Sequence, residues 1–302
     1  MWTPKASYII YNTNTEITSS DNRMNLLSDY RIVNGDTIQK VFEISEAAEE
    51  SVHYVEKAGL KYGIIKNFYK DPSAVKNFIQ ENFTIFGSPI SNSPGLQLYF
   101  DIHFNKHLSH VMKYFHDILA KRYFPTNPTK EYGLPMWESY FNFYWKDMPA
   151  MKQNIIPHAD DFCYAFNCWI TKDIPEGTDF YTYSWNGHAP VHTISEFRSV
   201  NNREFSTFRR SLDSDHETRS TEIEWDTEKH LDPEVWNKYH TIKPEYNTVT
   251  YYPGMFFHMP SISPSYEENF LRMSQVYTYQ FLPPDEFARA YKRFRVSKHW
   301  EK

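Results

Sequence analysis

The sequence predicts an α+β fold in which helices come before a β-sandwich or barrel and one more helix follows it. The first observation is the order of patterns along the chain, because helical spacing gives way to strand-like runs and then returns. The second is composition: aromatic residues make up 18% of the chain, with 23 Tyr and 23 Phe, and such side chains suit a half-buried pleated surface. With 302 residues the chain is long enough to bury a substantial core.

The N-terminal part begins with a polar stretch, and residues 1–60 are expected to form an N-terminal extension with a short strand at 8–11. Residues 61–302 are expected to form a single domain, which opens on the strand pattern at 62–68. A helix should follow Asp71 and Pro72, because Asp is a good N-cap and Pro suits the first helical position. Apolar residues at three- and four-residue steps predict a second helix over 105–121.

The middle of the chain changes to strand-like runs at 140–145 and 162–171. The residues of a tight turn at 175–178 predict that a strand at 179–183 returns against its predecessor as a hairpin. Residues 184–245 lose periodicity and are polar, which is typical of a long insertion such as a lid or binding loop.

The last part of the chain returns to strands and ends with a helix. The expected strands lie at 248–252, 255–258 and 270–281. After Pro283 and Pro284, acidic residues followed by apolar residues at helical spacing predict a C-terminal helix on the outside of the β domain.

Composition and charge favour some partners over others. The net charge is −6 and basic clusters are interrupted by acids, so no nucleic-acid footprint is expected. The two cysteines, Cys163 and Cys168, are five apart and would lie on opposite faces of one strand, so an intrastrand disulfide is not expected and a reducing compartment fits. No signal segment or apolar run of about 18 residues occurs, which predicts a cytoplasmic protein outside the membrane.

A pair of metal-binding residue types stands at His158 and Asp160. Two residues apart on an extended strand, they point to the same side and can hold one cation. The pair is weak alone, but His258 follows a Pro-Gly turn at the end of a later strand. Two imidazoles and one carboxylate leave coordination positions open, an arrangement that suits Fe(II) oxygen chemistry.

An anion-binding pair stands on the last expected strand. Arg272 offers a planar fork of donors for a carboxylate, and Ser274 on the same face can add a hydrogen bond. Together with the metal-binding set, these residues predict a pocket for a dicarboxylate that carries a keto group.

These motifs resemble the core of the Fe(II)/2-oxoglutarate-dependent oxygenases, on the prolyl-hydroxylase-like side. The segment 64–78, together with Ser93-Pro94-Gly95, is similar to the N-terminal part of an uncharacterised group of putative oxygenases in that superfamily. The resemblance covers roughly residues 60 to 282. The segments that carry it are His158-Ala159-Asp160, Gly177-Thr178-Asp179-Phe180-Tyr181, Tyr252-Pro253-Gly254 leading to His258, and Arg272-Met273-Ser274.

The resemblance implies that His158, Asp160 and His258 ligate Fe(II), and that Arg272 with Ser274 binds the distal carboxylate of 2-oxoglutarate. It further implies that Asn142 or Tyr144 contacts the keto acid, with no basis for choosing between them. The implied fold is a double-stranded β-helix, a jelly-roll or cupin-like core with N-terminal supporting helices and a C-terminal helix, which holds the metal inside one end.

The activity implied by the resemblance is that of a dioxygenase. It would use O2 and 2-oxoglutarate as co-substrates, release succinate and hydroxylate an unidentified substrate. The presence of Asp160 disfavours a halogenase, which needs that ligand position for a halide. An acidic, aromatic-rich chain favours a small-molecule or peptide substrate over a phosphate backbone, and the insertion 184–245 is the candidate substrate-contact region.

Other interpretations of the same residues remain open. His258 could be a core imidazole, Asp160 a turn residue, and Arg272 the partner of an interior carboxylate. A cupin-like metalloprotein without 2-oxoglutarate chemistry would use the same ligands. A catalytically inactive binding module on the same fold would use none of them. The sequence gives no indication of oligomeric state.

Overall fold

The structure is a computed structural model that describes residues 35–82, 96–99, 107–123, 134–145, 157–160, 163–173, 177–184, 189–200, 235–261 and 271–282. Its helices are α2 (Gly35–Val41), α3 (Pro72–Asn82), α5 (Ser109–Arg122) and α7 (Ile194–Val200), with a 3-10 turn η2 (Glu56–Ala58). Its strands are β1 (Glu49–Val55), β2 (Leu60–Lys66), β3 (Leu96–Tyr99), β4 (Leu134–Trp145), β5 (Cys163–Trp169), β6 (Thr178–Tyr183), β7 (Trp236–Ile242), β8 (Thr248–Pro253), β9 (His258–Pro260) and β10 (Leu271–Leu282).

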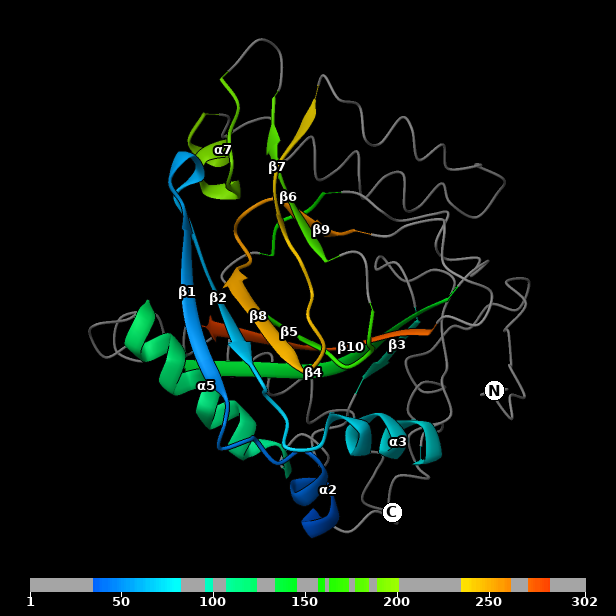
Figure 1. The fold of residues 1–302 in the computed structure, drawn as a ribbon. Helices are drawn as coiled ribbons and strands as arrows, with labels where there is room; N and C mark the ends of the chain where they lie inside the picture. Colours follow the sequence, from blue (N-terminus) through cyan, green and yellow to red (C-terminus); the bar gives the residue numbers. More distant parts are fainter. Residues whose placement is uncertain are drawn as a thin grey trace, which may run out of the picture.

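The strands form two antiparallel sheets, so the predicted β-rich core is confirmed. Among the described residues, the larger sheet has seven strands in the order β1-β2-β8-β5-β10-β4-β3, and the smaller sheet has three in the order β7-β6-β9. A single antiparallel bridge between His158 and His258 continues the smaller sheet beyond β9. Figure 1 shows the smaller sheet and α7 on one side of the larger sheet, and helices α2, α3 and α5 on the other.

One face of the larger sheet is covered by helices. Alternate residues of β10, among them Met273 and Tyr277, point to this face and join a core cluster with the apolar sides of α3 and α5. Phe115 of α5 stacks on Phe166 of β5 at a ring distance of 4.2 Å and on Phe68 at 5.3 Å. Both helices confirm the predicted helical spacing, although α5 begins four residues later than expected.

The opposite face of the larger sheet looks toward the smaller sheet. Ala165 of β5 and Tyr252 of β8 pack there against Phe180 of β6 and Ile242 of β7. Polar residues of the same face, among them Arg272, Ser274 and Asn142, lie toward the other end of these strands. The space between the two sheets is therefore apolar at one end and polar at the other.

The hairpin predicted between 162–171 and 179–183 is wrong. β5 pairs with β8 on one side and β10 on the other, and β6 pairs with β7 and β9 in the smaller sheet. Since both edges of β5 are occupied by strands distant in sequence, the chain crosses to the second sheet after β5. Local turn residues cannot reveal which distant strands compete for an edge.

Helices and strands are also present in segments for which the sequence predicted no regular structure. Residues 194–200 form α7, and 236–242 form β7, both inside the predicted insertion 184–245. β1 lies within the predicted extension 1–60 and pairs along its whole length with β2. The expected strand at 8–11 and the expected C-terminal helix lie outside the described residues. Among the residues that are described, no helix has both the length and the apolar character needed to cross a membrane.

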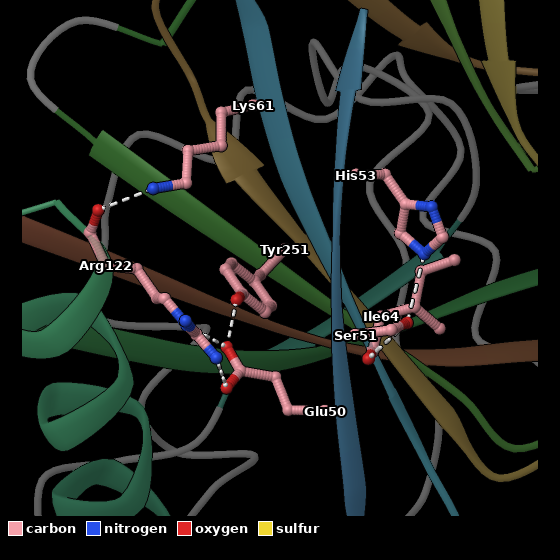
Figure 2. Close-up of polar contacts among 7 residues, drawn as sticks. All are labelled: Glu50, Ser51, His53, Lys61, Ile64, Arg122 and Tyr251. Carbon is pink, nitrogen blue, oxygen red and sulfur yellow. Dashed lines mark hydrogen bonds and ion pairs between the residues drawn. The ribbon is translucent and has the colours of Figure 1, made fainter.

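A partly buried ion pair joins the edge of the larger sheet to α5 (Figure 2). Arg122, the last residue of α5, donates from Nε and Nη2 to the Glu50 carboxylate of β1, at 3.0 and 2.7 Å. The Tyr251 hydroxyl donates to the same carboxylate. Gly63 of β2 stands opposite Tyr251, and a methyl group there would lie 2.0 Å from the tyrosine ring. Glycine at this position is therefore what lets Tyr251 reach Glu50.

Candidate metal centre

The backbone brings together two histidines that are 100 positions apart. His158 donates its backbone N–H to the carbonyl of His258 at 2.9 Å, and His258 returns the bond at 2.8 Å. Two residues later, Asp160 donates its backbone N–H to the carbonyl of Gly254 at 2.7 Å. This second bond ties the His158–Asp160 segment to the turn between β8 and β9. Main-chain hydrogen bonds from His158 and from Asp160 thus hold the two segments that carry the predicted set of His158, Asp160 and His258 together.

The ligand atoms of these three residues converge on one point. The Asp160 carboxylate lies 3.6 Å from Nε2 of His258 and 4.0 Å from Nε2 of His158. Because metal–nitrogen bonds are about 2.1 Å long, two ligand atoms on one ion lie at most about 4.2 Å apart. Every pair of ligand atoms in the set is within 4.8 Å. The three ligand atoms are therefore grouped closely enough to be candidate ligands of one ion.

His258 has the protonation and orientation that a metal ligand needs. Its Nδ1 donates to the backbone carbonyl of Phe256 at 2.8 Å, which leaves the lone pair of Nε2 facing Asp160. Burial lowers the pKa of His258 to about 4, and the nearby His158 acts in the same direction, against the opposing effect of Asp160. The imidazole is therefore neutral at pH 7.

The metal-binding set has a closed side and an open side. On the closed side, the His258 ring lies edge-to-face with Tyr252 at 5.0 Å and beside Phe180 at 6.1 Å. The side chains of His158 and Asp160 are 50% and 39% exposed, whereas that of His258 is 5% exposed. Two imidazoles and a carboxylate reached from one side leave room for further ligands on an ion.

Arg272 occupies the polar end of the space between the sheets. It is 1% exposed and donates from Nη1 to the carbonyl of Ser261 at 2.7 Å. Ser261 follows β9 and stands three residues after His258, which is about 10 Å of extended chain. The guanidinium therefore reaches from the larger sheet to the segment that directly follows β9, the strand that carries His258.

The other predicted anion-binding residues lie on the strands around Arg272. Ser274 is 3% exposed and pairs across the sheet with Asn142 of β4. Asn142 is 8% exposed, and its Oδ1 is buried without a hydrogen bond among the described residues. Tyr144 pairs with Arg272 in the β4–β10 register, but its side chain lies outside the described part of the chain. Which of Asn142 and Tyr144 contacts a keto acid stays open.

Four further residues on the Arg272 face of the larger sheet were not predicted as site residues from the sequence. Trp169 and Asn167 lie on β5, and Thr250 and Tyr252 on β8. The Trp169 indole N–H donates to Thr250 Oγ1 at 3.3 Å, and Asn167 Nδ2 donates to the Tyr252 hydroxyl at 3.1 Å. The polar Asn167 within an apolar run was the available signal, since alternation places it on the same face as Trp169.

Comparison with known proteins gives similar structures but no matching family. No protein-family model matches the chain, and no curated protein matches it. The solved structures similar to it include the non-haem α-ketoglutarate-dependent epimerase SnoN from nogalamycin biosynthesis, at 10% identity and a TM-score of 0.37 over 73% of this chain and 77% of that one. A Pseudomonas putida prolyl-4-hydroxylase has 8% identity and a TM-score of 0.36 over 82% of this chain and 98% of that one.

HygX from Streptomyces hygroscopicus, solved with nickel and 2-oxoglutarate bound, has 8% identity and a TM-score of 0.32 over 73% of this chain and 82% of its own. These structures belong to the class of oxygenases that the sequence resembles. With TM-scores below 0.4 and identities of 10% or less, they do not establish an activity for this chain.

Proposed function

We propose that this protein is a non-haem Fe(II)- and 2-oxoglutarate-dependent dioxygenase that hydroxylates a small-molecule or peptide substrate. The observation that carries the proposal is the convergence of His158, Asp160 and His258 from distant segments, with Nε2 of a neutral His258 3.6 Å from the carboxylate. A solitary core imidazole would not be aimed at an aspartate and a second imidazole. This ligand set is the one that suits non-haem iron with open positions.

The three residues would hold iron, and Fe(II) would supply the site for O2 and keto-acid chemistry that ends in succinate and carbon dioxide. His258 contributes a rigid ligand because the Phe256 carbonyl fixes its ring. Tyr252 and Phe180 keep water from the buried side of that ring. Entry of substrate from the exposed side of His158 and Asp160 is part of the proposal.

Arg272 would bind the distal carboxylate of 2-oxoglutarate. A guanidinium offers paired donors to a carboxylate, and at 1% exposure such bonds are little weakened by water. Ser274 and either Asn142 or Tyr144 would complete the contacts with the keto acid. The insertion 184–245 remains the proposed region of substrate contact.

A jelly-roll core is the fold we propose for these sheets. Supporting this, the larger sheet interleaves early and late strands, with β10 between β4 and β5, and the smaller sheet places β9 beside β6. Such interleaving is typical of double-sheet jelly rolls. A reducing compartment such as the cytoplasm is also proposed, and the free, buried thiol of Cys168 is compatible with it.

Keto-acid turnover tests the proposed function. Protein supplied with Fe(II), ascorbate, O2 and labelled 2-oxoglutarate is expected to release labelled carbon dioxide and to form succinate. His158→Ala should abolish this, whereas His53→Ala, which changes an exposed histidine on β1, should not. Equal turnover by the two variants would contradict the proposal. Metal binding that 2-oxoglutarate does not perturb would favour a metalloprotein of another kind, and an absence of metal binding would favour a binding module.

A further inference from the structure

The guanidinium of Arg272 rests on the face of an indole. Its Cζ lies 5.0 Å from the ring centroid of Trp169 on the neighbouring strand β5. The two side chains are diagonal neighbours, since Trp169 pairs directly with Ser274, two residues along β10 from Arg272. Both are almost fully buried, at 1% for Arg272 and 2% for Trp169. At this distance a desolvated cation and an indole attract one another substantially.

Trp169 is itself fixed in one orientation. Its Nε1–H donates to Thr250 Oγ1 at 3.3 Å, and Thr250 is fully buried on β8. The indole therefore cannot turn over without leaving a buried donor unsatisfied, which costs free energy. A chain of contacts runs from β8 through β5 to Arg272 on β10, and the 2.7 Å bond from Arg272 Nη1 to the Ser261 carbonyl extends it to the smaller sheet.

An aromatic ring face and a carboxylate interact with an arginine side chain in different ways. A carboxylate would occupy the paired donors of the guanidinium and cancel its charge. A ring face uses none of the N–H groups and leaves the charge intact, while setting the plane of the fork. Ordering a long side chain in advance also lowers the entropy that a ligand loses when it binds.

We propose that Trp169, fixed by Thr250, is a positioning residue that holds the Arg272 guanidinium in the plane required for paired binding of the distal carboxylate of a dicarboxylic keto acid. This inference rests on the proposed function of Arg272. It assigns Trp169 a role in selecting keto acids that carry a second carboxylate over those that lack one. The role is distinct from metal binding, because no described contact joins Trp169 to the metal-binding set.

Keto-acid binding by Co(II)-loaded protein, measured by calorimetry, tests this role. The two ligands are 2-oxoglutarate and 2-oxobutyrate, which has no second carboxylate. Trp169→Leu should weaken 2-oxoglutarate binding roughly threefold to thirtyfold and leave 2-oxobutyrate and Co(II) binding unchanged. Trp169→Phe retains a ring face and should stay within about threefold of the wild type. Trp137→Leu, which removes an indole on the helix-covered face of the same sheet, is the matched control and should bind both ligands normally.

Several results would overturn the inference. Unchanged 2-oxoglutarate binding by Trp169→Leu would do so, as would equal weakening of both keto acids or weaker Co(II) binding, because each would reduce Trp169 to a packing residue. If the leucine variant does not fold, Thr250→Val decides, with an expected weakening of 2-oxoglutarate binding of about two- to tenfold and none for 2-oxobutyrate. Wild-type protein that fails to prefer 2-oxoglutarate would overturn the proposed function as well, and that failure is visible without any variant.

Discussion

The two faces of the larger sheet are built from the same strands but have opposite chemistry. On β10, Met273 and Tyr277 point toward the helices and join an aromatic core. Arg272 and Ser274 point the other way, into a buried space that also contains Asn142. Because side chains alternate along a strand, one run of residues can stabilise the fold on one face and present polar groups on the other. Stability and function should therefore be separable by choosing alternate positions.

The largest effect on the helix-covered face is expected from Phe115→Ala. Phe115 is fully buried and stacks on Phe68 and Phe166, so the variant leaves a cavity. We expect the free energy of unfolding to fall by about 3–5 kcal/mol in urea titrations. The fraction that remains folded should bind metal with unchanged affinity. Weakened metal binding in the folded fraction would show that the two faces are not independent.

On the face that looks toward the smaller sheet, Arg272→Lys should change ligand binding more than stability. Lysine keeps the positive charge but loses the planar fork, so the KM for 2-oxoglutarate should rise by roughly tenfold to a hundredfold. Metal affinity should stay at the wild-type value, as measured by Co(II) titration. A variant with an unchanged KM would remove Arg272 from the keto-acid site.

Steric competition between Gly63 and Tyr251 can be tested near the edge of the helix-covered face. Gly63→Ala places a methyl group against the Tyr251 ring and should cost about 1–3 kcal/mol of unfolding free energy. Tyr251→Leu removes the ring, so the double variant should lose less stability than the two single variants add up to. Additive losses would mean that Gly63 and Tyr251 do not compete for the same space.

The smallest expected effect concerns pH and Glu50. Burial alone would raise the pKa of Glu50, but hydrogen bonds from Arg122 and Tyr251 and the charge of Arg122 outweigh it and lower the pKa below its ordinary 4.5. A carboxyl whose pKa is lowered in the folded state stabilises the fold above its unfolded pKa, and this contribution is lost as the pH falls through the folded value. Glu50→Gln should therefore show a shallower loss of stability than the wild type below pH 4.5. Parallel stability curves for the two proteins would contradict the assigned role of the ion pair.

Much of the difference between the two faces of the larger sheet could be predicted from the sequence, because side-chain alternation and helical spacing are local properties. The spacing around His158 and Asp160 and the position of His258 after a turn were sufficient to predict a convergent set. Pairing between distant strands could not be predicted from the sequence. The strand that became β6 was expected to pair with β5, and β7 was not predicted because it lies within a polar stretch. Trp169 was missed for the same reason, since its contact with Arg272 depends on the register of β5 with β10.

Metal stoichiometry is the most direct test of the central claim that His158, Asp160 and His258 form one metal site. Purified protein reconstituted with Fe(II) without oxygen is expected to bind one equivalent per chain, and His258→Ala to bind none. His116→Ala, which changes a histidine of α5 on the helix-covered side, is expected to retain the full equivalent. An unaltered protein that binds no iron, or a His258→Ala variant that binds it as tightly as the wild type, would contradict the account.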